Sequence, residues 1–273
     1  MKFSVLMSVY HKEDPENFDM ALHSILVNQT MLPNDFVLVC DGPLTKELDS
    51  VIEKYCSLCP EILKVHRLEK NGGLGNALNY GLSLCKCDLV ARADSDDVCV
   101  PTRFETQVAY MQSNPQVAVC SSDIAEFESN PQKPQRIKRM PQEHGELYKM
   151  AKFRNPINHM AAMVRKKVIE EVGSYIHLHY LEDYYLWLRV LCSGYELGNI
   201  GQVLVHARVG NGMVQRRGSK QYISGWNTLS KYMMKHKMIG LPGYCKNMIC
   251  VSAFVFIPPF ARDFLYNKIL RKR

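Results

Sequence analysis

The sequence lacks three features that would place the chain in a simple class: a long hydrophobic run, an internal repeat and a low-complexity tract. Its longest apolar run, Met248 to Ile257, has about half the length that a bilayer-spanning helix needs, and Pro258-Pro259 ends it. Hydrophobic residues make up 47% and charged residues 22%, which excludes disordered, collagenous and coiled-coil chains. With 273 residues, the chain is expected to fold as one large domain or one and a half domains.

A cleavable secretory signal is also missing, because the apolar run after Met1-Lys2 stops at His11-Lys12 without a small-residue cleavage site. The ten cysteines are irregularly spaced, and Cys56 and Cys59 have no second pair at the spacing of a zinc ribbon. Together these absences favour a reducing cytoplasm over an oxidising compartment, and core or helical cysteines over a zinc module.

Positive charge exceeds negative charge, with a formal net charge of +7, and it concentrates in the second half of the chain. The richest stretches are 133–154, 208–220 and 268–273. They predict acidic partners, namely diphosphates, an anionic lipid surface or nucleic acid, with solvated basic faces as the alternative. The apolar run 248–257 with the basic tail after it predicts either an interfacial segment on an anionic membrane or a buried C-terminal helix.

Short β-branched runs alternate with stretches of helical period over the first 120 residues, which is typical of an α/β fold with a mostly parallel sheet flanked by helices. Asp14 caps a helix that begins at Pro15, and the turn Gly72-Gly73-Leu74-Gly75 opens a helix through Leu84. The other expected elements of this half are strands 3–10, 36–40, 63–68 and 88–93 and helix 46–58.

The pattern loosens after Asn114-Pro115. A strand is expected over 117–121, and the polar stretch 130–141 predicts a loop or a hairpin. Further helices are expected over 143–152, 166–172, 182–193 and 219–236.

Polar residues follow each of the four expected parallel strands: His11 to Asp14, Asp41-Gly42, Lys70 to Gly72, and Asp94 to Asp97. Because ligands of doubly wound sheets bind beyond the carboxyl ends of the strands, these residues are expected to meet at one edge. Asp94 and Asp96 have the spacing to share a magnesium or manganese ion that also bridges a diphosphate, although turns favour aspartate as well.

Three other groups have two interpretations each from the residues alone. Glu182 and Asp183 are either acids stabilised at a helix N-terminus or a catalytic carboxylate held at a pocket wall. His159 is more typical of a satisfied hydrogen-bonding residue than of a ligand. Arg216-Arg217 is either a clamp for a diphosphate or an exposed basic loop.

With these residues in view, the chain resembles the family-2 glycosyltransferases of the GT-A fold, and among them the small bacterial enzymes that build O-antigen, capsule and exopolysaccharide repeat units. The resemblance covers nearly the whole chain, in segments 4–10, 39–42, 70–79, 91–97, 155–159 and 181–189. Segment 91–97 is similar to the DxD signature of that family. Two positions depart from the usual pattern: Pro43-Leu44 replaces Ser-Thr, and Leu78 stands where many relatives have arginine.

The resemblance implies a role for individual residues. Asp183 is implied as the catalytic base, His159 and Glu182 as acceptor-side residues, and Asp96 as a ligand of Mn²⁺ or Mg²⁺. Asp94 is implied near the ribose, the diphosphate and the metal, with Asp97 as structural support. The donor-binding residues expected are Tyr10, Asp41, Asn71, Arg92, Asp94, Arg216 and Arg217.

The implied organisation is a GT-A domain over 1–218, with a nucleotide-sugar-binding half (1–115) and an acceptor-binding half (116–218), followed by a basic helical extension over 219–273. The implied activity is an inverting, metal-dependent transfer of glucose, galactose or an N-acetyl form from a UDP-sugar. The expected acceptor is a polyprenyl-pyrophosphate-linked sugar at the inner face of the cytoplasmic membrane, in surface polysaccharide synthesis, with no nucleic acid involved.

Two other functions are weighed against this one. A nucleotidyltransferase that makes nucleotide sugars would need a glycine-rich loop after the first strand, and Ser8 to Lys12 contains no glycine. A non-catalytic nucleic-acid binder would use the basic stretches, but the sequence contains no recognisable binding module.

Overall fold

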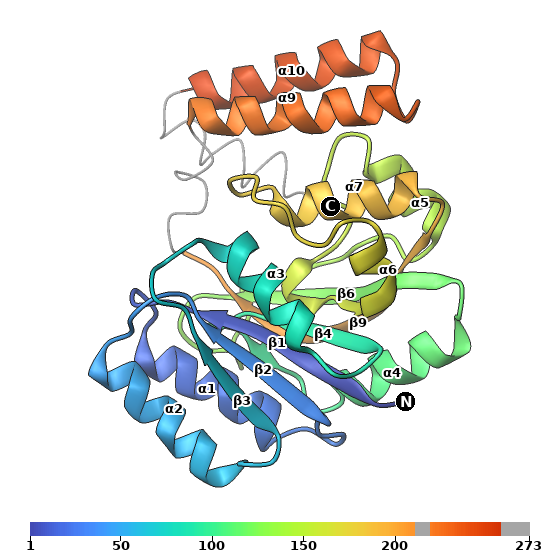
Figure 1. Cartoon of the computed structure of the whole chain (residues 1–273). Helices are drawn as coiled ribbons and strands as arrows, with labels where there is room; N and C mark the ends of the chain where they lie inside the picture. The colour runs from blue at the N-terminus through green and yellow to red at the C-terminus, as the bar shows by residue number, and fades with distance from the viewer. Residues whose placement is uncertain (211–218, 258–273) are drawn as a thin grey trace.

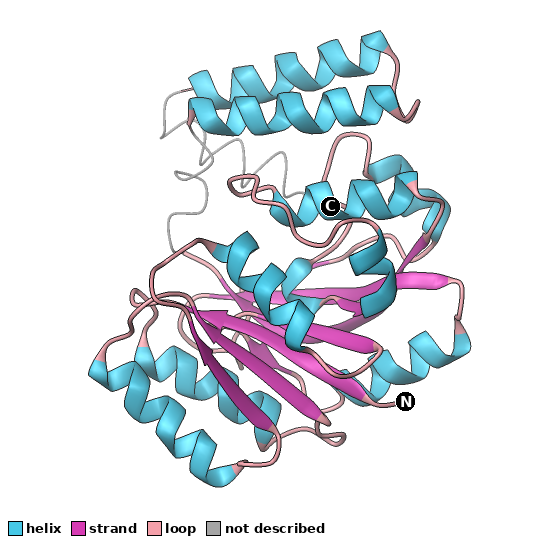
Figure 2. Ribbon diagram, in the orientation of Figure 1, coloured by secondary structure: helices cyan, strands magenta, loops and turns pink. Residues whose placement is uncertain are grey.

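A nine-stranded sheet forms the centre of the molecule, as the computed structural model in Figure 1 shows for residues 1–210 and 219–257. Its order is β3-β2-β1-β4-β8-β6-β9-β5, with β7 paired to β6. The strands are β1 (Phe3–Val9), β2 (Asp35–Cys40), β3 (Leu63–Arg67), β4 (Leu89–Ala93), β5 (Val98–Cys99), β6 (Val117–Phe127), β7 (Arg136–Lys138), β8 (Met163–Arg165) and β9 (Glu196–Arg208). Helices cover both faces of this sheet (Figure 2), so the expected α/β class is confirmed.

The first four long strands are parallel, as the sequence predicts. β1 lies between β2 and β4, and β2 pairs with β3. Every residue of β1, β2 and β4 is buried, which explains their nearly continuous apolar sequences. The carboxyl ends of these strands consequently meet at one edge of the sheet.

The second half of the sheet is mixed. β8 runs antiparallel to both β4 and β6, and β9 runs parallel to β6 with two irregularities in register around Asp123. β6 extends six residues beyond the expected end at Ser121, and β7 pairs with it as the hairpin alternative predicted. β9, β5 and the helix α4 (Arg103–Ser113) are absent from the elements expected from the sequence.

The helices divide the core into two clusters, one on each face of the sheet. α1 (Pro15–Leu26), α2 (Lys46–Leu58) and α4 cover one face, and α3 (Leu74–Leu84), α6 (Lys166–Glu171) and α7 (Glu182–Cys192) cover the other (Figure 1). α3 lies very close to the strands because Gly81 has no side chain. A Cβ there would stand 2.5 Å from Leu6 Cδ1 and 2.7 Å from Val39 Cγ2.

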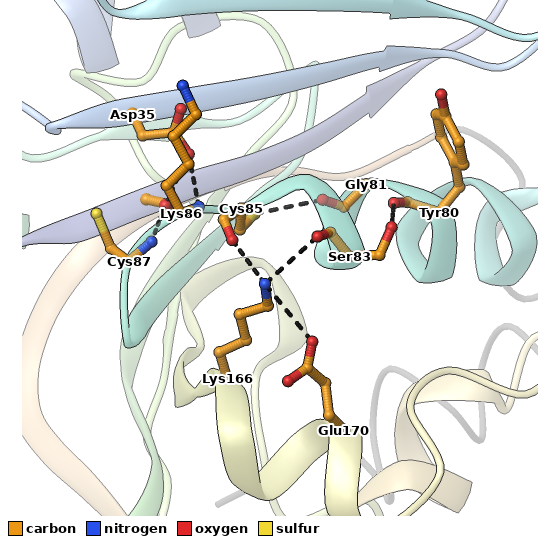
Figure 3. Close-up of polar contacts among 10 residues, drawn as sticks. Asp35, Tyr80, Gly81, Ser83, Cys85, Lys86, Cys87, Lys166 and Glu170 are labelled. Carbon is orange, nitrogen blue, oxygen red and sulfur yellow. Dashed lines mark hydrogen bonds and ion pairs between the residues drawn. The ribbon is translucent and has the colours of Figure 1, made fainter.

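Lys166 ties the acceptor half to the C-terminus of α3 (Figure 3). Its ammonium group donates to the carbonyl oxygens of Cys85 at 2.6 Å and Ser83 at 3.4 Å, and it lies 3.5 Å from a Glu170 carboxylate oxygen. A cation is favourable at this end of a helix, where carbonyl groups have no partner within the helix. Residues from the two halves of the chain therefore share one capping contact.

The C-terminal part consists of a helical hairpin, α9 (Lys220–Lys235) and α10 (Leu241–Phe256), that lies over α7 (Figure 1). The division of the chain at residue 218 stays a prediction, but Leu229, Met233 and Val251 of the hairpin belong to the same hydrophobic cluster as α7. Within the described ranges, no helix has both the length and the hydrophobicity needed to cross a bilayer.

Candidate functional site

A cluster of three carboxylates lies directly beyond the carboxyl end of β4. Asp94, Asp96 and Asp97 each offer an oxygen atom, and these atoms all lie within 4.8 Å of one another. Asp94 is additionally paired with Arg92, whose side chain is only 3% exposed. The loop after β4 therefore collects three carboxyl groups at the sheet edge predicted from the sequence.

Mutual repulsion and burial perturb this cluster. The pKa of Asp96 is raised to about 7, chiefly by desolvation and then by the charges of Asp94 and Glu13. Desolvation, followed by the charges of Asp96 and Asp94, raises the pKa of Asp97 well above its ordinary value. The guanidinium groups of Arg208 and Arg92 lower the pKa of Asp96 and of Asp97, respectively, but do not offset burial and carboxylate repulsion.

Asp97 also has a structural partner, as the sequence interpretation proposed. Its Oδ1 accepts a hydrogen bond from the backbone N–H of Arg208 at 2.7 Å, while its buried Oδ2 has no hydrogen-bond partner. The Arg208 guanidinium donates to the carbonyl oxygen of Asp96 at 3.2 Å. The end of β9 thus holds the acidic loop in place, a contact that joins residues more than a hundred positions apart.

Glu13, from the loop between β1 and α1, is a member of this site that the sequence did not single out. Ser95 Oγ donates to Glu13 Oε2 at 2.5 Å, which brings the loops after β1 and β4 together. The sequence contained an indication of Glu13, since His11 to Asp14 follow the first strand at the same edge of the sheet. Glu13 was simply one polar residue among several there.

The donor set of the acidic cluster fits a hard divalent cation. Carboxylate oxygens are the ligands that Mg²⁺ and Mn²⁺ prefer, and such ions commonly bind through one or two carboxylates plus substrate phosphates. The buried Oδ2 of Asp97 and the raised pKa of Asp96 both indicate a place where a cation would relieve unfavourable electrostatics.

Asp41 and the glycine turn form a second part of the site. Asp41 accepts hydrogen bonds from the backbone N–H groups of Gly72 at 2.7 Å and Gly73 at 3.0 Å, and Asn71 Nδ2 donates to its carbonyl oxygen at 3.1 Å. These two N–H groups are therefore engaged by Asp41. Tyr10, at the end of β1, is 39% exposed at the same edge.

Asp183 lies in the first turn of α7. Asn155 Nδ2 donates to Asp183 Oδ2 at 2.6 Å, and the Asn155 Oδ1 accepts from the backbone N–H of Ile157 at 3.2 Å. The second bond fixes which way the amide points, so that its NH₂ group faces the carboxylate. Asp183 Oδ1 accepts from the N–H of Tyr184 at 2.7 Å.

An aromatic pair, His159 and Tyr175, interacts with charged residues of both the acidic cluster and α7. His159 Nε2 lies 3.0 Å from the Tyr175 hydroxyl, and the His159 ring stands edge-on to Trp187. Burial raises the pKa of Tyr175, which also interacts with the charges of Arg92, Asp183 and Asp94. Desolvation followed by the charge of Arg92 lowers the pKa of His159 well below its ordinary value, which keeps its ring neutral.

Glu182 and His177 lie against the glycine turn. Glu182 is 8% exposed, its Oε1 is 3.7 Å from His177 Nδ1, and a Cβ on Gly75 would stand 3.0 Å from its Cγ. Desolvation raises the pKa of Glu182 to about 7, with a further contribution from Asp183. Gly75 is therefore needed for the close approach of α7 to the start of α3.

The structure thus gathers most of the site residues expected from the sequence in two groups. One group is the acidic cluster with Asp41 and the glycine turn, and the other is Asp183 and Glu182 at the start of α7. Arg92, Tyr175 and His159 link the two groups. Arg216 and Arg217 lie outside the described residues. Their expected role in binding the diphosphate stays a prediction.

Comparison with known proteins gives the chain a family. The sequence profile described as "Glycosyl transferase family 2" matches residues 4–173. The amylovoran biosynthesis glycosyltransferase AmsE of Erwinia amylovora is 38% identical over 266 residues, covering 97% of this chain and 98% of the relative. An Escherichia coli UDP-Gal:alpha-D-GlcNAc-diphosphoundecaprenol beta-1,3-galactosyltransferase is 38% identical over 271 residues, covering 99% and 97%.

Solved structures give the same fold. Staphylococcus aureus TarS 1–349 in complex with UDP-GlcNAc aligns with a TM-score of 0.69 at 17% identity, over 98% of this chain and 76% of that chain. The mannosyltransferase PcManGT from Pyrobaculum calidifontis in complex with GDP-Man and Mn²⁺ aligns with a TM-score of 0.64 at 16% identity, over 96% and 72%. The expected GT-A fold is confirmed.

Proposed function

The chain belongs to glycosyl transferase family 2, and on that premise we propose that it transfers a hexose from a UDP-sugar to a lipid-pyrophosphate-linked sugar in bacterial surface polysaccharide synthesis. The proposed sugars are glucose, galactose and their N-acetyl forms. Support comes from the names of two relatives that match this chain over nearly its whole length, one in amylovoran biosynthesis and one a galactosyltransferase for a diphosphoundecaprenol-linked GlcNAc.

The observation that carries the proposal is the position of Asp183. Its carboxylate accepts a hydrogen bond from Asn155, and the charges of both Asp183 and Asp94 contribute to the raised pKa of the buried Tyr175. In the proposed reaction Asp183 takes the proton from the acceptor hydroxyl, whose oxygen attacks the anomeric carbon while the bond to the diphosphate breaks. A single displacement of this kind inverts the anomeric centre.

The other residues bind and orient the donor. We propose that Asp41, Asn71 and Tyr10 contact the base and ribose of the donor, and that Arg92, which is paired with Asp94, orients that carboxylate. Asp96 and Asp94 would hold Mn²⁺ or Mg²⁺, which when bound supplies charge neutralisation for the departing diphosphate. Glu182 and His159 would shape the acceptor side, next to Asp183.

The proposed acceptor carries a long lipid, so the enzyme would work at a membrane surface. We place it in the cytoplasm, as a peripheral protein at the inner face of the cytoplasmic membrane, where UDP-sugars are available. The two other functions considered from the sequence, nucleotidyl transfer and non-catalytic nucleic-acid binding, are not the activity that defines the matching family.

Replacement of Asp183 by Asn tests the role of the base. The single Asn oxygen can keep one of the two hydrogen bonds that the Asp183 carboxylate accepts, the one from Asn155, while the basic group is lost. We expect the transfer rate to fall by about 10²- to 10⁴-fold, with UDP affinity unchanged. The rate would be measured with Mn²⁺, a panel of UDP-sugars and a synthetic N-acetylglucosaminyl-pyrophosphate lipid, and UDP affinity by calorimetry.

Asp19→Asn is the matched control, because Asp19 lies on α1 and pairs with Lys54 on the opposite face of the sheet. It should transfer sugar at the wild-type rate. NMR of the product's new anomeric bond checks the inversion. An Asp183→Asn enzyme with full activity would exclude Asp183 as the base.

A further inference from the structure

The outward face of α10 is apolar, and no residue of the described ranges 1–210 and 219–257 covers it. Leu241 is 66% exposed, Ile249 68% and Phe256 72%, and the exposed residues Cys245 and Ala253 lie between them. Spacings of three and four residues place all five on one side of the helix, over a length of about 22 Å. We call these five residues the α10 face.

The opposite side of α10 accounts for its attachment to the rest of the protein. Val251 and Val255 belong to the core cluster shared with α7 and α9, and Asn247 Nδ2 donates to the carbonyl oxygen of Lys152 at 2.9 Å. The α10 face is therefore not needed for packing within the described part of the chain. Its apolar character calls for an outside partner.

Charge around the hairpin indicates what kind of partner this is. Residues 219–257 contain no aspartate or glutamate. They contain five lysines, all exposed: Lys220, Lys231, Lys235, Lys237 and Lys246. Lysines bordering an apolar helix face attract anionic lipid headgroups while the apolar side chains enter the acyl region. A second copy of the same hairpin would instead bring like charges together.

From this combination we propose that the α10 face docks on an anionic lipid bilayer. The hairpin lies on the same side of the sheet as α7, which carries Asp183 (Figure 1). Docking there would hold the acceptor side of the enzyme near the membrane. This proposal rests on the membrane location proposed above and names the surface that would bind the lipid. Lipid binding itself requires no catalysis.

The test is sedimentation of the full chain with vesicles that contain no acceptor. Vesicles of phosphatidylglycerol mixed with phosphatidylcholine should bind the wild-type protein, and vesicles of phosphatidylcholine alone should bind it much more weakly. The double variant Ile249→Glu, Phe256→Glu should lose at least about tenfold in affinity, because burial of each exposed side chain contributes roughly a factor of five or more. The milder Ile249→Ser variant should lose severalfold.

Leu58→Glu is the matched control, since Leu58 is 58% exposed on α2, at the opposite face of the sheet. It should bind vesicles like the wild type. Transfer to a soluble short-chain acceptor, unchanged in all variants, would show that they are folded and would keep the vesicle result separate from the proposed reaction.

Three results would overturn the proposal. One is equal vesicle binding by the wild type and the Ile249→Ser and double variants, and another is the absence of wild-type binding to the anionic vesicles. The third is a wild-type dimer in light scattering that the double variant abolishes, because the α10 face would then be covered by a second copy.

Discussion

At the scale of single residues, Glu182 is a buried carboxyl whose environment affects stability. Burial raises its pKa from an ordinary value of 4.5 to about 7. The folded state therefore binds this proton more tightly than the unfolded state. Its stabilising contribution is fully present below about pH 4.5 and is lost as the pH rises to about 7.

Glu182→Gln should consequently be more stable than the wild type at pH 8, by roughly 1 to 3 kcal/mol, and nearly equal to it at pH 4.5. Urea unfolding at both pH values measures the difference. Glu53→Gln, at an exposed position on α2, is the control and should leave the stability unchanged at either pH. A Glu182→Gln variant that is less stable at pH 8 would contradict the assigned cause.

Individual residues could be predicted from the sequence where a motif indicates their chemistry. Contacts between residues that are distant in the sequence could not be predicted. The carboxylates Asp94 and Asp96 were identified because their spacing alone suits an ion. The bond between Asn155 and Asp183 spans 28 positions, and no local pattern encodes it. Likewise, only the structure reveals that Asp41 occupies the N–H groups of the glycine turn.

At the scale of elements, the contact of α3 with the sheet depends on Gly81. Gly81→Ala would place a Cβ 2.5 Å from Leu6 Cδ1 and 2.7 Å from Val39 Cγ2, so side chains in the core must shift. We expect the free energy of unfolding to fall by about 1 to 3 kcal/mol, the usual cost of overpacking. Urea or thermal unfolding provides the measurement.

Gly145→Ala gives the opposite result at a second helical glycine. Gly145 lies in α5 (His144–Met150), and a Cβ there would meet nothing within 4 Å. This change should stabilise the protein by up to about 1 kcal/mol, because alanine loses less backbone entropy on folding. If Gly81→Ala and Gly145→Ala had the same free energy of unfolding, the close packing of α3 on the sheet would not limit the stability of the protein.

Elements with strong local signals were predicted well. α2 begins after the cap Thr45, and α3 begins after the glycine turn, and the sequence located both. β9 was missed because polar residues such as Asn199 and His206 interrupt its apolar pattern. It forms because ten of its residues pair with β6, an interaction between distant segments that no local window contains.

At the scale of the whole molecule, the hairpin α9–α10 and the sheet share one core cluster, although the hairpin is the last described part of the chain. Trp226 of α9 stacks edge-on against Tyr184 of α7, and a Cβ on Gly225 would stand 2.8 Å from Leu181 Cδ1. Contacts this close should make the hairpin unfold together with the sheet.

The chain has two tryptophans, which makes this expectation measurable. In Trp187→Phe the remaining fluorescence reports on the hairpin, and in Trp226→Phe it reports on α7. Within each variant, the urea midpoint from fluorescence should equal the midpoint from far-UV circular dichroism. An earlier fluorescence midpoint in Trp187→Phe alone would instead mark the hairpin as a separate unit.

The ten cysteines of this chain are all free in the structure, and the two that are exposed, Cys245 and Cys250, both lie on α10. Their thiols are natural attachment points for a spin label or an environment-sensitive dye. A probe on Cys245 would sit within the α10 face, and one on Cys250 at its border. The protein therefore carries built-in depth markers, whose signals on lipid vesicles would indicate how far each side of the helix enters the bilayer.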